Sequence, residues 1–245
     1  MGNTNFIFGT RATIEAIKSG KTIDKLLIKR EFKSDLYKEL RELIKERQIN
    51  LQVVPEQKLN RITRKNHQGV IAFISPVPFY DLDEIIMQTY EKGESPFFLY
   101  LDQITDVRNF GAIVRSAECA GVHAIIVPEK GSAQINADAV KTSAGALHLV
   151  PLCKVRNGVN TLADLQKNGV KIFAATEKAG SNYVDFDYTT PCTIVMGSEE
   201  DGITDDLLRT ADELIKIPLK GKIESLNVSV ATGILLFEVV KQRRV

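Results

Sequence analysis

Apolar residues in the first third of the chain follow two different periods. Apolar runs of strand length occupy residues 25–28, 51–54 and 70–74, and helical spacing occurs over residues 10–18, 34–47 and 56–62. In the long helical segment, Leu36, Leu40 and Ile44 recur at helical spacing, and Ser34 stands where it can cap the helix. Strands and helices that alternate on this scale predict a small α/β module.

The pattern changes after Pro96, where short apolar runs are continuous rather than alternating. They cover residues 97–101, 124–127, 171–175, 193–196 and 213–217, with helical segments between them. Continuous apolar runs are typical of strands that are covered on both faces. The sequence therefore predicts a mostly parallel sheet with helices on both faces, whose ligand binds at the loops that follow the carboxyl ends of the strands.

A proline-containing segment, Ser75-Pro76-Val77-Pro78, separates the two patterns. Proline cannot continue a strand ladder, and it biases the residue before it towards an extended conformation. We therefore expect two domains, residues 1–77 and 96–245, joined by a linker over residues 78–95 in which residues 81–90 can form a helix.

Charge is distributed unevenly between these two parts, although the whole chain has a net charge of only +1. Residues 1–77 carry 15 Lys and Arg against 8 Asp and Glu, a net of +7, whereas residues 78–245 carry 17 against 23, a net of −6. Clustered positive charge favours a partner with a phosphate backbone, because neutralising phosphates releases condensed counterions. The solvated faces of helices such as residues 35–47 are the alternative explanation.

Several common protein classes lack support in the sequence. The longest apolar run, residues 233–237, is far shorter than a membrane span, and residues 1–13 do not resemble a secretory leader, so we expect a cytoplasmic protein without membrane association. Neither a dinucleotide-binding nor a P-loop glycine motif occurs. The histidines are too dispersed for zinc, so we expect no metal. The cysteines lie among apolar neighbours and are expected to be buried thiols: Cys119, Cys153 and Cys192.

Polar residues gather in three loops that follow predicted strands. In the first, residues 106–117, Asn109 can form a turn or a helix cap, and Gly111 permits a close approach of the backbone. Arg115 follows on the emerging helix among apolar neighbours, which is not an obvious place for a solvated side chain. A pairing with Glu118, or a position along the surface, is the alternative explanation for Arg115.

The second loop, residues 196–203, contains two glycines around the acids Glu199, Glu200 and Asp201. Gly197 would let a ligand reach the backbone, whereas three carboxylates would repel a phosphate. The alternative is the acidic start of a helix, where carboxylates interact favourably with the helix dipole.

The third loop, residues 217–230, places Ser225, Asn227 and Ser229 at the start of an almost wholly apolar helix. A helix cap explains one of them, and buried polar groups without partners cost about 1–3 kcal/mol each, so we expect a role at a site. The helix, residues 228–240, is apolar on more than one face. A second copy of the chain would cover it most simply, and we therefore predict a symmetric homodimer.

Three ordered segments resemble the three motifs of the SpoU family of RNA ribose 2′-O-methyltransferases. They are N-F-G-A-I-V-R-S-A from Asn109, G-S-E-E-D-G-I from Gly197 and I-P-L-K-G-K-I-E-S-L-N-V-S-V-A from Ile217, and their order and spacing match over residues 97–241. In the front module, F-G-x-x-A-x-x-E-A-I (residues 8–17) and N-H-Q-G-V (residues 66–70) resemble the ribosomal-protein-L30e-like substrate domain common in that family.

The resemblance implies an α/β protein with a C-terminal trefoil-knot methyltransferase domain and a smaller N-terminal L30e-like α/β domain that binds RNA. A knot is a feature that the general rule against knotted chains would have excluded. The implied cofactor is S-adenosyl-L-methionine (AdoMet), without a metal, held by the backbone of the knotted loops at Thr176, Gly197, Ile217 and Leu226. The family's polar catalytic positions match Asn109, Arg115, Glu199, Ser225 and Asn227.

The implied reaction is methylation of a ribose 2′-hydroxyl in structured RNA, closest to the branch that modifies a guanosine of large-subunit (23S) ribosomal RNA. Arg115 is the family's candidate for activating the hydroxyl, and because a guanidinium resists deprotonation, we expect it to stabilise the developing alkoxide rather than to act as a base. A transfer RNA substrate, or a non-catalytic RNA-binding protein on the same fold, is the alternative. Glu200 and Val107 depart from residues frequent in the family, which leaves fine substrate preference open.

Overall fold

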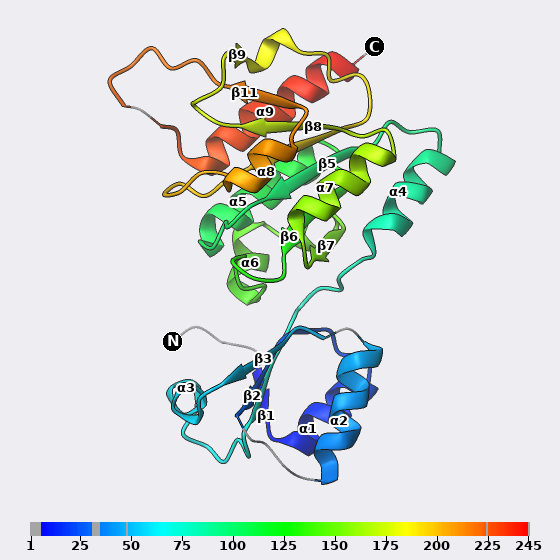
Figure 1. Ribbon diagram of the computed structural model, residues 1–245, viewed down its shortest axis with the longest axis vertical. Helices are drawn as coiled ribbons and strands as arrows, with labels where there is room; N and C mark the ends of the chain where they lie inside the picture. Colours follow the sequence, from blue (N-terminus) through cyan, green and yellow to red (C-terminus); the bar gives the residue numbers. More distant parts are fainter. Residues whose placement is uncertain (1–5, 31–34, 48, 224, 245) are drawn as a thin grey trace. The chain divides into compact units, whose positions relative to one another are not determined.

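The computed structural model describes residues 6–30, 35–47, 49–223 and 225–244 (Figure 1). Contacts within the chain divide it between Pro78 and Phe79 into two compact units, and the short segment Ile135–Asp138 groups with the first. None of the described helices is long and apolar enough to cross a membrane.

The first unit is a small sheet with helices on both faces. Among the described residues it has four strands in the order β1-β4-β2-β3, of which only β2 and β3 run parallel. Leu26 and Ile28 pack against α1 and α2 on one face, and Leu27 packs against α3 on the other. The elements are β1 (Phe6–Phe8), α1 (Thr10–Lys18), β2 (Ile23–Lys29), α2 (Asp35–Glu46), β3 (Leu51–Val54), α3 (Glu56–Ile62) and β4 (Val70–Ile74).

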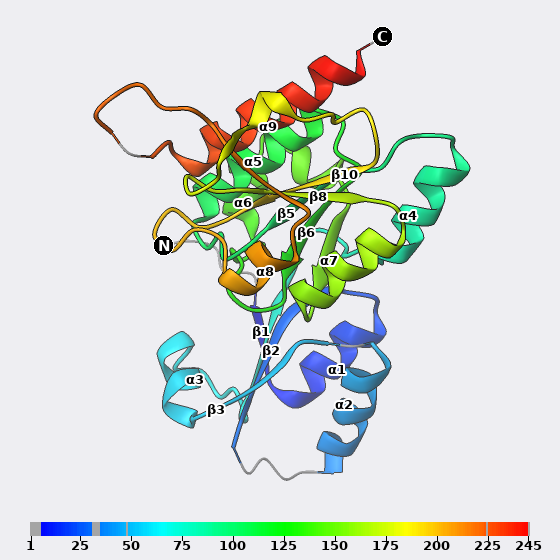
Figure 2. The same cartoon turned by 45° about the horizontal axis from the view of Figure 1, so that its top comes forward.

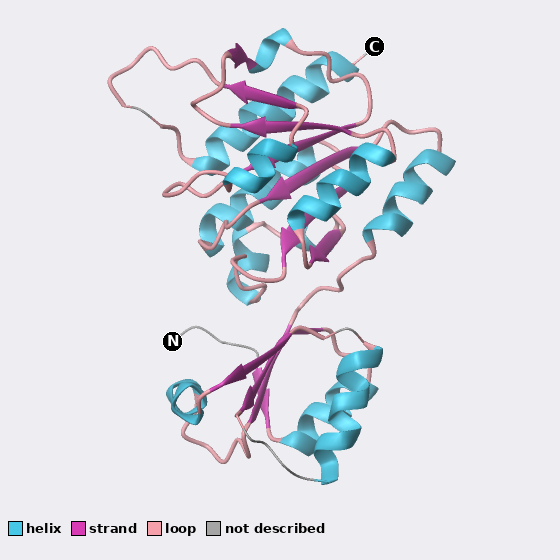
Figure 3. Cartoon of the chain, in the orientation of Figure 1, coloured by secondary structure: helices cyan, strands magenta, loops and turns pink. Residues whose placement is uncertain are grey.

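The second unit is built on a parallel sheet (Figure 3). Its described part has seven strands in the order β7-β6-β5-β10-β8-β11-β9, and every pair is parallel. The elements are α4 (Leu82–Glu91), β5 (Phe97–Leu101), α5 (Val107–Cys119), β6 (Ala124–Pro128), α6 (Ala137–Thr142), β7 (Leu152–Val155), α7 (Gly158–Lys167), β8 (Lys171–Ala175), β9 (Ser181–Asn182), β10 (Cys192–Met196), α8 (Asp205–Thr210), β11 (Glu213–Lys216) and α9 (Val228–Arg243).

Helices cover both faces of this parallel sheet, which explains why its central strands have continuous apolar sequences. Side chains of α4, α7 and α8 pack with Phe98 and Tyr100 of β5 on one face. The neighbouring residue of β5, Phe97, points to the other face, where the Arg243 guanidinium of α9 lies 5.2 Å from its ring. α9 also packs along α5 (Figure 2). Every residue of β5 and β10 is buried as a result.

The last turn of α9 is fixed to the segment that precedes β10. The Arg243 guanidinium donates hydrogen bonds to the carbonyl oxygens of Ser95 (2.8 Å), Pro96 (3.2 Å), Tyr188 (2.8 Å) and Thr190 (2.7 Å). These carbonyls belong to residues flanking β5 and β10, so one side chain holds three parts of the chain together.

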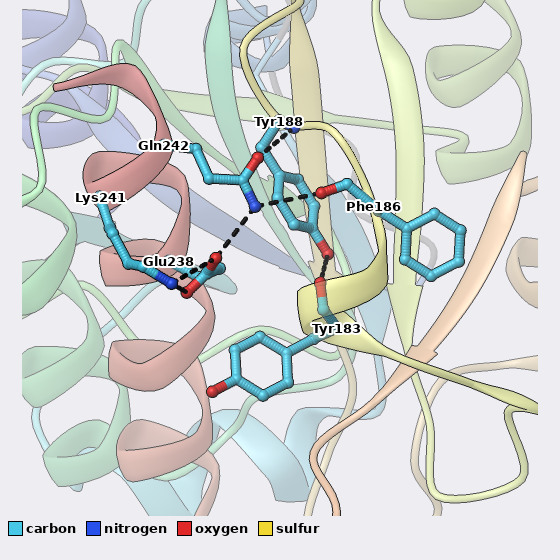
Figure 4. A network of polar contacts seen from close by, with 6 residues as sticks. All are labelled: Tyr183, Phe186, Tyr188, Glu238, Lys241 and Gln242. Carbon is cyan, nitrogen blue, oxygen red and sulfur yellow. Dashed lines mark hydrogen bonds and ion pairs between the residues drawn. The ribbon is translucent and has the colours of Figure 1, made fainter. Parts of the chain in front are cut away.

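A second network, drawn in Figure 4, supports the same turn of the helix. Gln242 accepts a hydrogen bond from the Tyr188 amide (3.0 Å) and donates to Phe186 O (3.1 Å) and to Glu238 Oε1 (2.9 Å). Lys241 Nζ lies 3.1 Å from the other carboxylate oxygen of Glu238. α9 is therefore a rigid support for whatever its N-terminal end carries.

The predicted fold class, an α/β protein with a parallel sheet, is confirmed. Strands and helices occur where the periodicity predicts them, and the structure has three further strands that the periodicity does not predict, β1, β7 and β9. The predicted cap at Ser34 lies outside the described residues.

The expectation that all three cysteines are buried is wrong for Cys119, which is exposed because it lies off the inward-facing stripe of α5 that ends at Ala117. Cys153 and Cys192 are buried, and burial raises the pKa of the Cys192 thiol to about 11, so it stays protonated at neutral pH.

Candidate functional site

A cavity of about 430 Å³ opens at the carboxyl ends of β8, β10 and β11. In the sheet, β8 lies between β10 and β11, whereas in the sequence β10 comes between β8 and β11. The loops after them and the first turns of α9 form the walls of the cavity. The predicted cofactor residues all line it, and two of the predicted catalytic residues do as well: Thr176, Gly197, Ile217, Leu226, Glu199 and Ser225.

Three polar residues far apart in the sequence meet beside this cavity. The Asn227 side-chain amide donates one hydrogen bond to Asn109 Oδ1 (2.9 Å) and another to Glu199 Oε1 (2.6 Å). Asn109 lies in the first turn of α5, Glu199 follows β10, and Asn227 precedes α9. The three polar loops predicted from the sequence are thus joined at one point.

Asn227 also caps α9, so its side chain has a partner at both ends. Its Oδ1 accepts hydrogen bonds from the amides of Ser229 (3.0 Å) and Val230 (3.4 Å) and from the Ser229 hydroxyl (2.5 Å). Capping satisfies helix amides that otherwise lack partners. The side-chain amide then points away from the helix towards Asn109 and Glu199, so the start of α9 fixes the geometry of the site.

The acidic loop after β10 is not the start of a helix, which corrects one of the alternatives considered for it. Ser198 and Gly202 pair across a tight turn, and α8 begins only at Asp205. Glu199 instead reaches the N-terminal end of α9, where its Oε1 also accepts a hydrogen bond from the Val228 amide (3.2 Å). A carboxylate of this loop therefore does interact favourably with a helix dipole. The helix is α9, however, and not α8, which is the next helix in the sequence.

A second cavity, of about 310 Å³, lies on the other side of the acidic loop. The segment Ser198–Asp201 and Val228 line both cavities. Asn109 and Asp106 line only the second one, together with residues 103–105. The Asn109–Asn227–Glu199 cluster therefore stands where the two cavities meet.

Close packing requires glycine at two positions of the site. A Cβ atom at Gly197 would overlap the peptide between Gly202 and Ile203, which folds back over it. A Cβ atom at Gly111 would overlap the Thr142 side chain. The tight turn after β10 and the packing of α5 against the end of α6 therefore both depend on glycine.

Among the predicted catalytic residues, Arg115 alone neither lines one of these cavities nor, as Asn227 does, makes a described hydrogen bond to residues that line them. It is exposed on the outer side of α5 and lines neither of them. Its expected alternative partner, Glu118, makes no ion pair with it among the described residues. Arg115 is thus free to contact a molecule outside the chain.

Two acids that the sequence patterns do not single out hold the site together. Asp106 caps α5 by accepting a hydrogen bond from the Asn109 amide (2.8 Å), so Asn109 lies inside the helix and not at its cap. Asp102, at the end of β5, is buried and accepts a hydrogen bond from the Thr204 amide (2.8 Å). An acid directly after a continuous apolar strand is the sequence signal that could have identified Asp102.

The residues around the first cavity fit AdoMet. Its volume lies within the usual range for small-molecule sites. Ile217, Leu219 and Leu226 offer apolar surface for an adenine ring, and the carboxylates of Glu177 and Glu199 suit a positively charged sulfonium. No group of side chains in the described part of the chain has the arrangement needed to hold a metal ion.

Two family models match the chain. The one described as the SpoU rRNA methylase family covers residues 96–237, and the one described as RNA 2′-O ribose methyltransferase substrate binding covers residues 6–80. The methylase match lies in the second unit, and the substrate-binding match covers the first unit.

Curated relatives match over nearly their whole length. YacO of Bacillus subtilis strain 168, whose name places it in the TrmH family of tRNA/rRNA methyltransferases, is 33% identical over 239 residues, which are 98% of this chain and 96% of YacO. A relative from Staphylococcus saprophyticus, named for the same family, is 34% identical over 237 residues, 97% of this chain and 95% of the relative.

Solved structures show the same architecture. The SpoU methyltransferase AviRb of Streptomyces viridochromogenes, in complex with AdoMet, is 25% identical with a TM-score of 0.61 and covers 97% of this chain and 90% of its own. The TrmH/SpoU tRNA modifying enzyme of A. aeolicus is 32% identical with a TM-score of 0.56, over 66% of this chain and 84% of its own.

Proposed function

Because the chain belongs to the SpoU methylase family of RNA methyltransferases, we propose that it transfers the methyl group of AdoMet to a ribose 2′-hydroxyl of structured RNA. The observation that carries this proposal is the meeting of Asn109, Glu199 and Asn227 at the point shared by two cavities. A methyl transfer needs one site for the donor and one for the acceptor, held in line with each other.

The first cavity is the proposed AdoMet site, with Thr176, Gly197, Ile217 and Leu226 as the residues that hold the cofactor. When bound there, AdoMet supplies an electrophilic methyl group. The complex of AviRb with AdoMet supports the same cofactor for this chain. Ser225, which lines the cavity, is proposed to support the bound donor.

The second cavity is the proposed place of the target nucleoside. Asp106, Glu200 and Asp201 line it, so it repels phosphate and suits a group that donates hydrogen bonds. Guanine carries such donors at N1 and N2, as adenine and cytosine do at their exocyclic amines, so the lining fits the guanosine of large-subunit ribosomal RNA that the family resemblance favours without selecting it. Transfer RNA is the alternative substrate, and the names of the relatives include both RNA classes.

Arg115 is proposed to stabilise the developing alkoxide of the ribose. A ribose hydroxyl is a weak nucleophile, and a guanidinium can stabilise negative charge but cannot readily accept a proton. Arg115 faces solvent in the single chain and lines neither cavity, so this role requires the ribose to extend from the second cavity towards the exposed side of α5. Asn109, Glu199 and Asn227 would fix the loops that hold the two reactants.

A homodimer through α9 and the knot region is also proposed. α9 buries one side against the sheet, yet Val230 is 52% exposed and Phe237 is 45% exposed on the other side. Two large apolar side chains two turns apart on one helix suit a second copy of the chain. The knot is likewise proposed from the family fold.

The decisive test of the reaction supplies the protein with methyl-labelled AdoMet and separate pools of unmodified ribosomal and transfer RNA. We expect label in ribosomal RNA, at a guanosine whose ribose resists alkaline cleavage on its 3′ side. Label in transfer RNA alone would support the alternative substrate. Labelled base instead of ribose would contradict the proposal, and RNA binding without transfer would support the non-catalytic alternative.

Arg115→Ala tests the proposed role of this residue. Since Arg115 does not line the AdoMet cavity, AdoMet affinity should remain unchanged while methyl transfer falls by about a hundredfold or more, the usual effect of removing a group that stabilises transition-state charge. Binding is measured by calorimetry and transfer by incorporated label. Arg115→Lys keeps the charge but not the planar fork and should recover only part of the rate. Normal turnover of Arg115→Ala would refute the assignment.

A further inference from the structure

Basic residues of the first unit concentrate on one part of its surface. Five exposed side chains, of Arg30 at the end of β2, Lys58 and Arg61 on α3, and Arg64 and Lys65 in the loop before β4, carry no ion pair among the described residues. We call these five residues the basic edge. The one described acid beside them, Glu56, already lies 3.8 Å from Lys29.

Backbone hydrogen bonds show that the segments of the basic edge are neighbours. The Arg30 amide donates to Val54 O (3.1 Å), directly before α3 begins. The Lys29 amide donates to Gly69 O (2.9 Å), at the end of the loop that carries Arg64 and Lys65. The end of β2, the start of α3 and the start of β4 therefore meet at one end of the small sheet.

The loop that carries Arg64 and Lys65 is held in place from within. His67 is buried, its Nε2 lies 2.9 Å from Asn60 Oδ1 of α3, and its Nδ1 accepts a hydrogen bond from the Gly69 amide (3.0 Å). Gln68 adopts a left-handed conformation with φ of 50°, which strains a side-chain-bearing residue. Such a fixed loop keeps its two cationic side chains exposed without a large cost in conformational entropy on binding.

The other charged surface of the first unit differs in composition. On α2, the exposed Lys38, Arg41 and Lys45 alternate with the exposed Glu42 and Glu46. Mixed charges of this kind are typical of a solvated helix face. The positive excess of the first unit is therefore located at the basic edge rather than on α2.

We propose that the basic edge is the surface by which the first unit holds the phosphate backbone of the RNA substrate. This inference takes RNA as the partner from the proposed function, and it adds which surface of the first unit binds that RNA. Phosphate neutralisation by several cations that make no ion pair, among them Lys65, whose ammonium lies 5.9 Å from the Phe8 ring, matches the chemistry of RNA backbones, whereas the acidic second cavity excludes phosphate.

Charge-removing pairs test the basic edge against a matched control. The variant Arg64→Gln/Lys65→Gln removes two charges from the edge, and Lys38→Gln/Arg41→Gln removes two from α2. Binding of a labelled RNA hairpin is measured at several salt concentrations. The edge variant should bind about tenfold more weakly, and its slope of log affinity against log salt should fall by about 1.4–1.8, as expected for two lost phosphate contacts. The α2 variant should match the wild type.

The outcome separates this proposal from the proposed reaction. At saturating RNA, the edge variant should retain the wild-type methyl-transfer rate and show only a raised KM, because it leaves the AdoMet cavity unchanged. Thermal unfolding confirms that both variants fold. An unchanged salt slope in the edge variant, or an equal loss in the α2 variant, overturns the basic edge. If the wild type binds RNA but methylates none, the binding comparison still tests the surface while the reaction fails.

Discussion

Asn227 performs two tasks with the two ends of one side chain. Its oxygen caps α9, and its amide bridges Asn109 and Glu199. Serine is also a good helix cap, but it has no amide that could reach two acceptors. Substitutions at this position can therefore separate helix stability from the site.

We expect Asn227→Ser to keep nearly the wild-type free energy of unfolding while methyl transfer falls by tenfold or more. Asn227→Ala should lose the same activity and also about 1 kcal/mol of stability, because the cap disappears. Urea unfolding and label incorporation measure the two quantities. Equal activity in Asn227→Ser and the wild type would show that the bridge is dispensable.

The individual residues of the site could be selected from the sequence because polar side chains before an apolar helix need an explanation. Asn227 was identified in this way and by the family motifs, whereas Glu199, one of three acids between two glycines, was assigned to the site by the family motifs alone. The direction of Arg115 could not be inferred, since its exposure depends on which side of α5 faces α9 and the sheet. Asp102 was missed because its partner, the Thr204 amide, lies 102 positions away in the sequence.

At the scale of elements, α9 connects the site to the far end of the domain. Its first residue follows Asn227, and its last turn is held by Gln242 (Figure 4) and also by Arg243. The hydrogen bond from Gln242, assisted by Lys241, holds the pKa of Glu238 below its ordinary value despite the opposing effect of burial. The anchoring of the helix therefore depends on pH.

Because the pKa of Glu238 is lower in the folded chain than in the unfolded chain, its contribution to stability is complete above about pH 4.5 and is lost as the pH falls through the folded value. We expect Glu238→Gln to be less stable than the wild type at neutral pH, with a difference that shrinks in acid. Urea unfolding over a pH series measures it. A difference that stays constant with pH would contradict a charged Glu238 as the cause.

Arg243 also stabilises the last turn of α9, and unlike the contribution of Glu238, its contribution does not depend on the charge of a carboxylate. Loss of Arg243 removes hydrogen bonds from a charged donor to four backbone carbonyls, of which Pro96 O keeps the Cys192 amide (2.9 Å) and Thr190 O belongs to an exposed residue, and such a loss costs about 1–3 kcal/mol. We expect Arg243→Ala to be destabilised by roughly that amount and to lose hydrogen-exchange protection in the last turn of α9. Lys45→Ala, on the exposed face of α2, is the control and should be unchanged within about 0.5 kcal/mol.

At the scale of the whole molecule, the proposed dimer explains why α9 is apolar beyond the side that packs on the sheet. Val230→Glu/Phe237→Glu would bury two carboxylates in the interface, at a cost of about 3–5 kcal/mol for an uncompensated buried charge. We expect this variant to be a monomer by light scattering at concentrations where the wild type is a dimer. Val53→Glu, at an equally exposed valine of β3, is the control and should remain dimeric. A monomeric wild type would contradict the dimer directly.

The sequence by itself determined the local elements and the positions of the polar loops. Apolar periodicity reflects which side of each segment is buried. This pattern can be recognised from a few neighbouring residues, as in the continuous apolar run of β5 or the helical spacing in α1. The family motifs then supplied the chemistry that periodicity cannot specify. Short strands such as β1 and β9 carried too few residues for a period to be recognised.

Only the tertiary structure decided which loops meet. β10 lies between β5 and β8, and this insertion brings the loop of Glu199 next to the start of α5 and to the N-terminal end of α9. Hydrogen bonds act over about 3 Å, so they depend on strand order and helix packing rather than on sequence distance. For the same reason, Glu199 of the acidic loop contacts the start of α9 rather than that of α8, and Arg115 faces solvent rather than the cavity.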